Sequence, residues 1–177
     1  MISRIEVLNF RCLRYIRQSL GRFHVLVGPN ASGKTTFLDV IGFVSDLVSE
    51  GLDYAVGKRT TNFRDLVWGR EEKGFEIALE APIPDECRGL LAEENQRFNT
   101  IRYELGISSD AETGETVIAA EQGFLTITTP PELSQKALFP SPEARLSRNG
   151  VDTKKLFGYQ SGHENHRYPF TDPRARG

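Results

Sequence analysis

The chain has 177 residues, of which 38% are hydrophobic and 26% charged, with a formal net charge of −2. It can hold one domain with a real core, or a domain followed by a tail, and its composition excludes a collagen-like chain, a coiled-coil rod and a wholly disordered chain. No apolar run approaches the roughly 18 residues that cross a bilayer, so we expect no membrane partner. The two cysteines, Cys12 and Cys87, form no disulfide framework, which favours a cytoplasmic location.

Charge is distributed unevenly along the chain. Residues 1–34 carry six basic side chains and one acidic one (+5), residues 35–141 carry nine and nineteen (−10), and residues 142–177 carry seven and four (+3). A positive N-terminal segment suits an anionic ligand. A solvated surface with uneven charge explains the pattern equally well, and the negative total argues against a generally basic nucleic-acid coat.

Three strands are predicted in the first 27 residues. Residues 2–10 alternate polar and apolar side chains, which is typical of a strand, and residues 15–20 predict a second, shorter strand. Residues 23–27 (Phe-His-Val-Leu-Val) form a compact apolar run that ends at Gly28. This run predicts a buried strand.

The pattern becomes helical after Gly33. Apolar residues recur three or four positions apart, which predicts an amphipathic helix over residues 33–49 that ends before Gly51. The expected apolar stripe consists of Phe37, Ile41, Val44 and Val48. Asp39 and Asp46 fall on the opposite, polar face, where we expect them to be solvated.

The remainder of the chain predicts a short helix and a loop, followed by a β-meander. We expect the helix and loop within residues 51–73, strands over 75–79, 99–108, 116–120 and 124–129, a surface helix over 85–94, and turns at 110–114 and at Gly123. Residues 131–177 are rich in proline and poor in periodic apolar residues. We therefore expect a first unit over residues 1–130 and a loop-rich or disordered segment over residues 131–177.

One motif carries chemistry. Residues 28–35, Gly-Pro-Asn-Ala-Ser-Gly-Lys-Thr, fit the phosphate-loop (Walker A) pattern G-x-x-x-x-G-K-[ST] completely. A loop that wraps a phosphate must point successive backbone N–H groups inward, and glycine leaves room for that approach. The helix that follows directs its positive end at the same phosphates. The motif therefore predicts binding of a nucleoside triphosphate, with ATP and Mg²⁺ as the expected cofactors.

Lysine and threonine give the loop its charge and its metal ligand. Lys34 would reach the β- and γ-phosphates, Thr35 would supply a hydroxyl to Mg²⁺, and Thr36 a second hydroxyl nearby. The expected nucleotide-binding residues of the loop and helix are Gly28, Asn30, Ala31, Ser32, Gly33, Lys34, Thr35 and Thr36. No catalytic residue is assigned from the sequence.

The opening Ile2-x-x-Ile-x-Val-x-Asn-Phe-Arg11, together with residues 28–39 (Gly-Pro-Asn-Ala-Ser-Gly-Lys-Thr-Thr-Phe-Leu-Asp), resembles the SMC/RecF-like branch of ABC-type ATPases. Within this branch, the chain looks like the N-terminal portion of bacterial AAA-family ATPases related to the OLD family. The resemblance extends through Phe43-Val-Ser-Asp-Leu and Asn62-Phe-Arg-Asp-Leu-Val-Trp68 and covers about residues 1–80.

The resemblance implies an α/β fold: the N-terminal half of a P-loop NTPase head, with an antiparallel β-layer beside the P-loop core. It implies that Arg11 approaches the nucleotide phosphates and that Asn30 lies on the γ-phosphate side. Without the family, Arg11 would be a surface arginine at the end of the first strand. The family also implies a second head as partner, forming a homodimer around two ATP molecules, and possible DNA or companion-nuclease partners.

The sequence departs from the family in its catalytic parts. No run of four apolar residues followed by Asp-Glu (Walker B) occurs, no Ser-Gly-Gly signature is present, and Val117-Ile-Ala-Ala-Glu121 comes nearest with a single acid. The metal-contacting hinge glutamine of the family could be Gln122, Gln135 or Gln160. We therefore expect the N-terminal part of a longer ATPase, or one half completed by a partner chain, that binds ATP better than it hydrolyses it.

Two other functions remain open from the sequence. One is a regulatory module that senses a nucleotide and gates a partner without hydrolysis. The other is a DNA-binding protein that uses its basic N-terminal face without ATP. The first interpretation, an ATP-driven switch built on a P-loop ATPase head, explains the complete phosphate-loop motif best.

Overall fold

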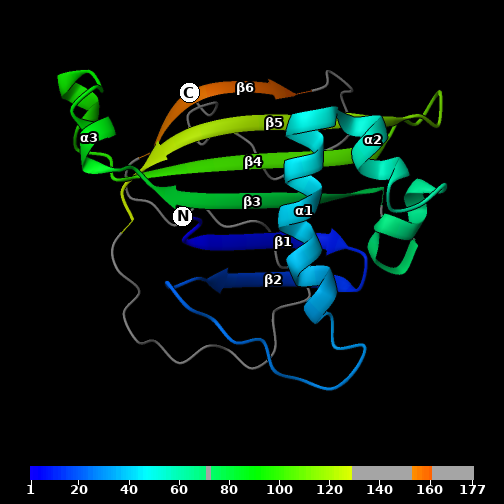
Figure 1. Ribbon diagram of the computed structural model, residues 1–177. Helices are drawn as coiled ribbons and strands as arrows, with labels where there is room; N and C mark the ends of the chain where they lie inside the picture. Colours follow the sequence, from blue (N-terminus) through cyan, green and yellow to red (C-terminus); the bar gives the residue numbers. More distant parts are fainter. Residues whose placement is uncertain (71–72, 129–152, 161–177) are drawn as a thin grey trace.

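A computed structural model describes residues 1–70, 73–128 and 153–160 of the chain. In these residues, six strands form one antiparallel sheet in the order β2-β1-β3-β4-β5-β6 (Figure 1). The strands are β1 (Arg4–Phe10), β2 (Leu13–Ser19), β3 (Gly74–Pro82), β4 (Thr100–Ser109), β5 (Thr116–Thr126) and β6 (Thr153–Gln160). The mixed α/β fold with an antiparallel β-layer agrees with the prediction.

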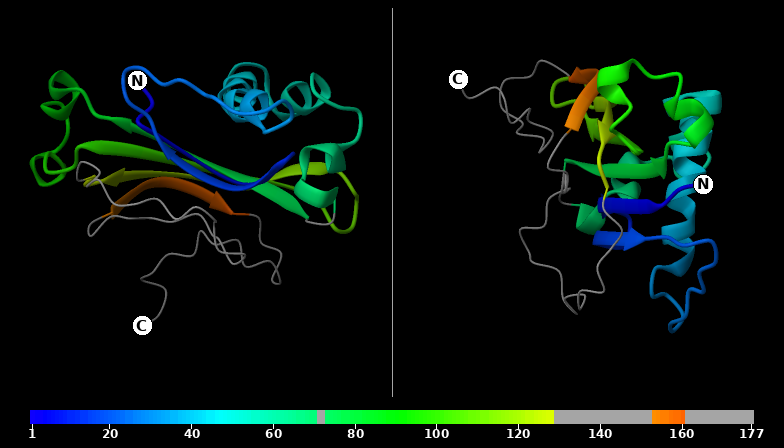
Figure 2. Two further views of the ribbon diagram at one scale, coloured as in Figure 1. Left: turned by 90° about the horizontal axis from the view of Figure 1, so that it is seen from below. Right: turned by 90° about the vertical axis from the view of Figure 1, so that its left-hand side faces the viewer.

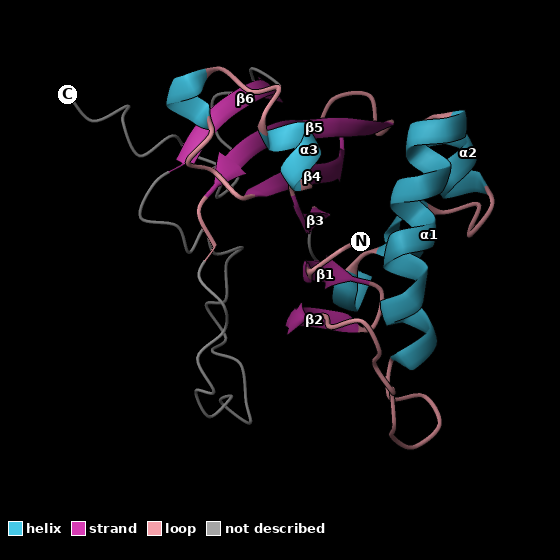
Figure 3. Ribbon diagram, turned by 60° about the vertical axis from the view of Figure 1, so that its left-hand side comes forward, coloured by secondary structure: helices cyan, strands magenta, loops and turns pink. Residues whose placement is uncertain are grey.

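The main helix, α1 (Lys34–Glu50), runs across the strands on one face of the sheet, and α2 (Leu52–Gly57) continues it on the same side (Figures 2 and 3). Two short 3₁₀ turns, η1 (Phe63–Leu66) and η2 (Trp68–Arg70), lead into β3. The short helix α3 (Asp85–Arg88) and the turn η3 (Glu93–Asn95) connect β3 to β4. None of the helices among the described residues has the length and apolar character needed to span a membrane.

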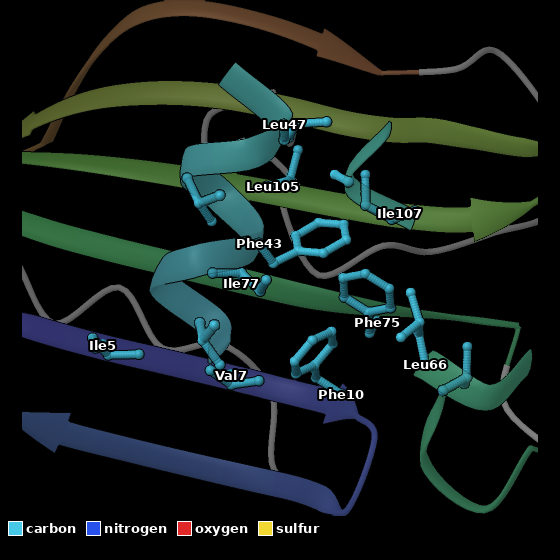
Figure 4. Packing of buried hydrophobic residues seen from close by; sticks show 14 of the residues in the cluster. Ile5, Val7, Phe10, Phe43, Leu47, Leu66, Phe75, Ile77, Leu105 and Ile107 are labelled. Atoms are coloured by element: carbon cyan, nitrogen blue, oxygen red, sulfur yellow. The ribbon is translucent and has the colours of Figure 1, made fainter. Parts of the chain in front are cut away.

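The core lies between α1 and the sheet (Figure 4). Every second residue of β3 and β4 faces the helix, because side chains alternate between the two faces of a strand. In β1, Ile5 and Val7 follow the same rule, and Phe10 joins them because Asn9 (φ 59°) interrupts the alternation. Phe10, Phe43 and Phe75 meet edge to face, with ring centroids 4.9–5.8 Å apart. Each such pair adds about 0.5–1.5 kcal/mol beyond simple burial, so these rings tie the helix to two adjacent strands.

The buried stripe of α1 differs in part from the predicted one. Phe37 and Val44 are buried as expected, but Val48 is 73% exposed and Ile41 only partly buried. The residues of α1 that face the sheet are Phe37, Val40, Phe43, Val44 and Leu47. An apolar run this dense has two candidate faces about one position apart, and the aromatic contacts of Phe43 select between them.

A turn was predicted at Gly123, but this residue lies inside a single long strand, β5. A Cβ atom at this position would collide with the ring of Phe157 on β6. The glycine therefore makes room for an aromatic ring from a strand that the sequence analysis did not predict. A glycine is favoured both in a turn and where another side chain approaches the backbone closely, so the presence of glycine alone does not tell the two apart.

The predicted buried strand at residues 23–27 does not form. These residues have no strand conformation, and Phe23, Val25 and Val27 are 82%, 65% and 85% exposed. The segment belongs to the long connection that leaves the sheet between β2 and α1 (Figure 1). Among the described residues no backbone hydrogen bond pairs it with a neighbouring strand. Its apolar sequence suits burial on both faces, but no described strand lies beside it.

The face of the sheet opposite α1 carries buried charge. Arg102 is 1% exposed and donates from Nη2 to Glu6 (2.9 Å), from Nη1 to Glu80 (2.8 Å) and from Nε to Glu104 (2.6 Å). Burial alone would lower the pKa of this guanidinium, but the carboxylates of Glu104 and Glu6 raise it. One arginine thus links carboxylates of β1, β3 and β4, and each partner satisfies a charge that would otherwise be costly to bury.

Glu76 lies on the same face without such a partner. It is 5% exposed, pairs in register with Leu8 and Gly106, and its Oε2 atom has no hydrogen bond. Burial, followed by the nearby carboxylates of Glu104 and Glu6, raises the pKa of Glu76 to about 8. The Glu76 side chain is therefore neutral at pH 7 in the folded chain and ionised in the unfolded chain.

This protonation makes stability depend on pH. Between the unfolded pKa of 4.5 and the folded value of about 8, the folded state holds one more proton than the unfolded state. Stability therefore falls as pH rises through this window, by about 1.4 kcal/mol per pH unit. Glu76→Gln should be more stable than the parent chain at pH 8 and lack this part of the slope, as measured by urea denaturation from pH 5 to 9.

The exposed Glu86 of α3 provides the control. Glu86→Gln should leave the parent pH dependence unchanged. If Glu76→Gln shows the same slope as the parent chain, Glu76 is not the group that binds the extra proton.

Candidate functional site: the phosphate loop and its arginine

The phosphate loop lies between the extended segment 23–27 and the start of α1. Gly33 forms the N-terminal cap of the helix in the left-handed conformation (φ 87°), and no side chain caps the first turn. A Cβ atom at Gly33 would approach Leu13 Cδ2 to 3.1 Å and Cys12 Sγ to 3.4 Å. Glycine therefore meets both a backbone and a space requirement here, and the N–H groups of the first helical turn remain available to an anion.

The ammonium group of Lys34 lies against the loop. Its Nζ donates to the carbonyl oxygens of Gly28 (2.8 Å) and Pro29 (2.6 Å) and lies 3.3 Å from Ser32 Oγ. The loop is thus folded around its own lysine. A phosphate that enters the loop can replace these neutral acceptors by an anionic one, which attracts the ammonium more strongly than a carbonyl oxygen does.

Arg11 lies in the turn between β1 and β2, close to the start of α1. Its backbone has a φ of 53°, and its N–H donates to Leu66 O at 2.8 Å, so the turn is tied to η1. The next residue, Cys12, places its Sγ 3.3 Å from Thr36 Oγ1 in the first turn of the helix. The turn therefore brings the predicted Arg11 and Thr36 to the same place.

A cavity of about 540 Å³ opens between this turn, the first turn of α1 and the η1–η2 segment. Its lining mixes charged, polar and apolar surface and consists of Arg11, Cys12, Thr36, Asp65, Val67, Gly69 and Arg70. It is a shallow depression that is wide open to solvent, with room for part of a small-molecule ligand. The cavity adjoins the phosphate-loop helix at Thr36, one residue beyond the proposed metal ligand Thr35.

The other predicted loop residues lie in the same connection. Asn30, Ala31, Ser32 and Thr35 are all exposed, and Ala31 has a φ of 63°. The described residues contain no group of three His, Cys, Asp or Glu side chains arranged for a metal ion. Thr35 remains the candidate metal ligand on the motif alone.

Several sequence candidates lie elsewhere. Glu121 of β5 accepts a hydrogen bond from Tyr103 Oη at 2.8 Å, which assigns its carboxylate to a contact within the sheet. Gln122 is buried on the face of the sheet opposite α1. Gln160 ends β6, and Gln135 lies outside the described residues.

Comparison with known families decides the class of protein. Residues 1–122 match the family described as "AAA ATPase domain". The chain belongs to this AAA ATPase domain family. The matched range contains β1 to β4, the phosphate loop, α1 and most of β5. The resemblance to AAA-family ATPases that the motifs indicated is therefore confirmed, and the family places the protein among ATPases.

Two individual proteins are similar to this chain. An OLD nuclease of Thermus scotoductus (strain ATCC 700910 / SA-01) is 50% identical over 44 residues, which are 25% of this chain and 8% of the nuclease. The chain thus aligns with less than a tenth of that relative. A solved structure described as "Structural biochemistry of ATP-driven dimerization and DNA stimulated activation of SMC ATPases" matches 66% of this chain and 67% of its own, at 19% identity and a TM-score of 0.45.

Sequence reasoning missed part of the site. Asp39 and Asp46 were expected to be solvated, but both are partly buried and form ion pairs with Arg59. Asp65 and Arg70 line the cavity and pair with each other at 2.7 Å. The position of Asp39, one helical turn beyond Thr36, was the signal that could have found it, because residues three apart share a helix face. The partner Arg59 comes from beyond the next helix, and periodicity does not reveal such a contact.

Replacing Gly33 tests the geometry of the loop. Gly33→Ala should lower the free energy of unfolding by about 1–2 kcal/mol, because alanine is strained at positive φ. It should also weaken ATP binding, because the new methyl group displaces Leu13 and Cys12 beside the loop. Chemical denaturation and ATP titration measure the two effects.

Gly114→Ala is the matched control. Gly114 also has a positive φ (74°), but no atom lies within 4 Å of the place that an added methyl group would take, and the residue belongs to the β4–β5 turn. This variant should lose similar stability and retain ATP affinity. Equal losses of affinity in both variants would mean that the Gly33 effect is global.

Proposed function

We propose that this chain binds ATP with Mg²⁺ through its phosphate loop and serves as the nucleotide-binding part of an ATP-driven switch. The observation that carries the proposal is the complete motif at residues 28–35, at the start of α1, where no side chain caps the first turn and Lys34 is folded against the loop. Family membership supports the same chemistry. Thr35 would hold Mg²⁺, and the cation would neutralise charge on the phosphates.

The cavity beside Thr36 supports a ligand larger than phosphate. A phosphate tail in the loop would place the rest of a nucleotide near the start of α1, and the cavity opens there with a volume of about 540 Å³. Arg11 lines this cavity, and its guanidinium can contact a phosphate oxygen while the loop holds the others. Arg11 therefore joins the loop residues in the proposed binding site.

Hydrolysis requires groups that this sequence does not supply. The sequence has no run of four apolar residues followed by Asp-Glu and no Ser-Gly-Gly signature, and Glu121 is engaged by Tyr103. Phosphoryl transfer depends on charge stabilisation and on an oriented water. We propose that a second polypeptide region, such as a second ATPase head, completes the site and makes hydrolysis possible. DNA or a nuclease as a further partner is a proposal that draws on the similarity to the OLD nuclease.

Removing the loop lysine tests ATP binding. Lys34→Ala should weaken MgATP binding at least tenfold, because a charge-assisted contact to phosphate contributes about 1.5–3 kcal/mol. Isothermal titration or a fluorescent ATP analogue measures the affinity. Unchanged affinity in this variant would remove the proposed function.

Lys155→Ala is the matched control for charge. Lys155 is an exposed lysine of β6, so its removal changes the net charge by the same amount away from the loop. This variant should bind ATP like the parent chain. A loss equal to that of Lys34→Ala would indicate nonspecific attraction of the anion.

A single-turnover assay with radiolabelled ATP tests the missing catalytic groups. The purified chain, in excess over ATP, should bind the nucleotide but release no phosphate above the buffer rate. Phosphate release that disappears in Lys34→Ala would show that the chain contains its own catalytic groups and would contradict this part of the proposal. Binding without hydrolysis, even after a second head is added, would favour the nucleotide-sensing module instead.

A further inference from the structure

The guanidinium of Arg11 does not extend freely into solvent. Its Nη1 atom donates to Oδ2 of Asp39 at 3.1 Å, and 41% of the Arg11 side chain remains exposed. The described contact therefore uses one nitrogen of a planar group that carries five N–H donors. The carboxylate fixes the direction of the guanidinium and leaves donors for another acceptor.

Asp39 is itself held in place by Arg59. The Nε and Nη2 atoms of Arg59 lie 2.9 Å and 2.7 Å from Asp39 Oδ1, and Nε also lies 3.0 Å from Oδ2. The two side chains thus meet in a forked arrangement that fixes the plane of the carboxylate. Oδ2 accepts the hydrogen bond from Arg11. The Asp39 carboxylate can therefore turn away from Arg11 only if its hydrogen bonds with Arg59 break.

Arg59 has little freedom to move. Its side chain is 7% exposed, Nη1 donates to Asp46 (2.8 Å) and to Ala55 O (2.8 Å), and its Cζ lies 5.2 Å from the centre of the Phe43 ring. A Cβ atom at Gly42 would approach Arg59 Nη2 to 3.2 Å, so this glycine provides the space. The Arg59 side chain is therefore held in place against the aromatic core.

We propose that Asp39 is a positioning residue for Arg11. Because the buried Arg59 side chain fixes the Asp39 carboxylate, Asp39 in turn holds the Arg11 guanidinium in the orientation that contacts the phosphates of the nucleotide. The inference rests on the proposed function, because it assigns a role toward the same ligand. The contacts run from Phe43 in the core, through Arg59 and Asp39, to Arg11 at the cavity. Asp39 does not touch the nucleotide.

The opposite role, competition with the phosphates for Arg11, predicts the opposite sign. A competing carboxylate would lower ATP affinity, both by occupying Arg11 and by repelling the triphosphate. A positioning carboxylate raises affinity because it removes the cost of ordering a long side chain before the ligand binds. The forked contact with Arg59 favours positioning, since Arg59 already balances the charge of Asp39.

A double-mutant cycle tests the proposal in the full chain. ATP affinity and thermal stability are measured for the parent, Asp39→Ala, Arg11→Ala and the double variant. We expect Asp39→Ala to weaken ATP binding about threefold to tenfold in the parent background, which is the size of effect expected when a ligand-binding group loses the contact that orients it. In the Arg11→Ala background the same change should no longer weaken binding. The melting temperature should fall in both backgrounds, because the contact with Arg59 is lost in both.

Two further variants keep the result interpretable. Asp46→Ala also removes a carboxylate from Arg59, but Asp46 contacts Lys58 and Arg59 and has no described contact with Arg11. It should lower stability and leave ATP affinity near the parent value. Asp39→Asn retains the shape and one acceptor oxygen, so it should fold even if Asp39→Ala does not, and it should show a smaller loss of affinity that again depends on Arg11.

The outcomes separate this inference from the proposed function. Tighter ATP binding in Asp39→Ala, or an equal loss with and without Arg11, would overturn the positioning role while Lys34-dependent binding stands. If the parent chain binds no ATP, or binds it independently of Lys34, the proposed function fails and the role of Asp39 fails with it.

Discussion

The packing of α1 against the sheet is the constraint on which the site depends. Phe43 contacts Phe10 and Phe75 from the middle of the helix, and Val40 and Leu47 extend the contact to either side. Once these residues are buried, the axis and the rotation of the helix are fixed. The start of the helix must then lie beside the β1–β2 turn, where Cys12 reaches Thr36. The position of the phosphate loop thus follows from hydrophobic burial about 10 Å away along a rigid helix.

Two buried arginines stabilise the molecule in different places. Arg102 joins three strands on the face opposite α1, whereas Arg59 joins α1 to the end of α2 near the proposed site. Both are surrounded by carboxylates, as a planar guanidinium with five donors requires when it leaves water. They differ in what lies at the far end of the network. Tyr15 and Arg4, which contact Glu6 and Glu80 of the Arg102 network, are residues of the sheet, whereas Asp39 contacts Arg11 at the rim of a cavity.

Local patterns predicted the parts of the fold that depend on neighbouring residues. The alternation of β1 and the phosphate-loop motif before α1 required only residues close in sequence, and both were identified. The stripe of α1 was one position off because a dense apolar run does not fix its own rotation. Gly123 and Asp39 were misassigned because their roles come from Phe157 and Arg59, and no spacing rule connects residues from different elements. Of the proposed site, the sequence predicted the loop residues and, by family resemblance, Arg11. It did not predict the network that holds Arg11.

The segment of residues 23–27 has a consequence for the behaviour of the chain in solution. Its side chains are exposed aromatic and β-branched groups, and its backbone pairs with no strand among the described residues. Such a segment resembles the open edge of a sheet, which is a template for pairing with another chain. A net charge of only −2 offers little electrostatic repulsion between copies. The protein should therefore self-associate more readily as its concentration rises, and any polypeptide that covers these five residues would act as a solubilising companion.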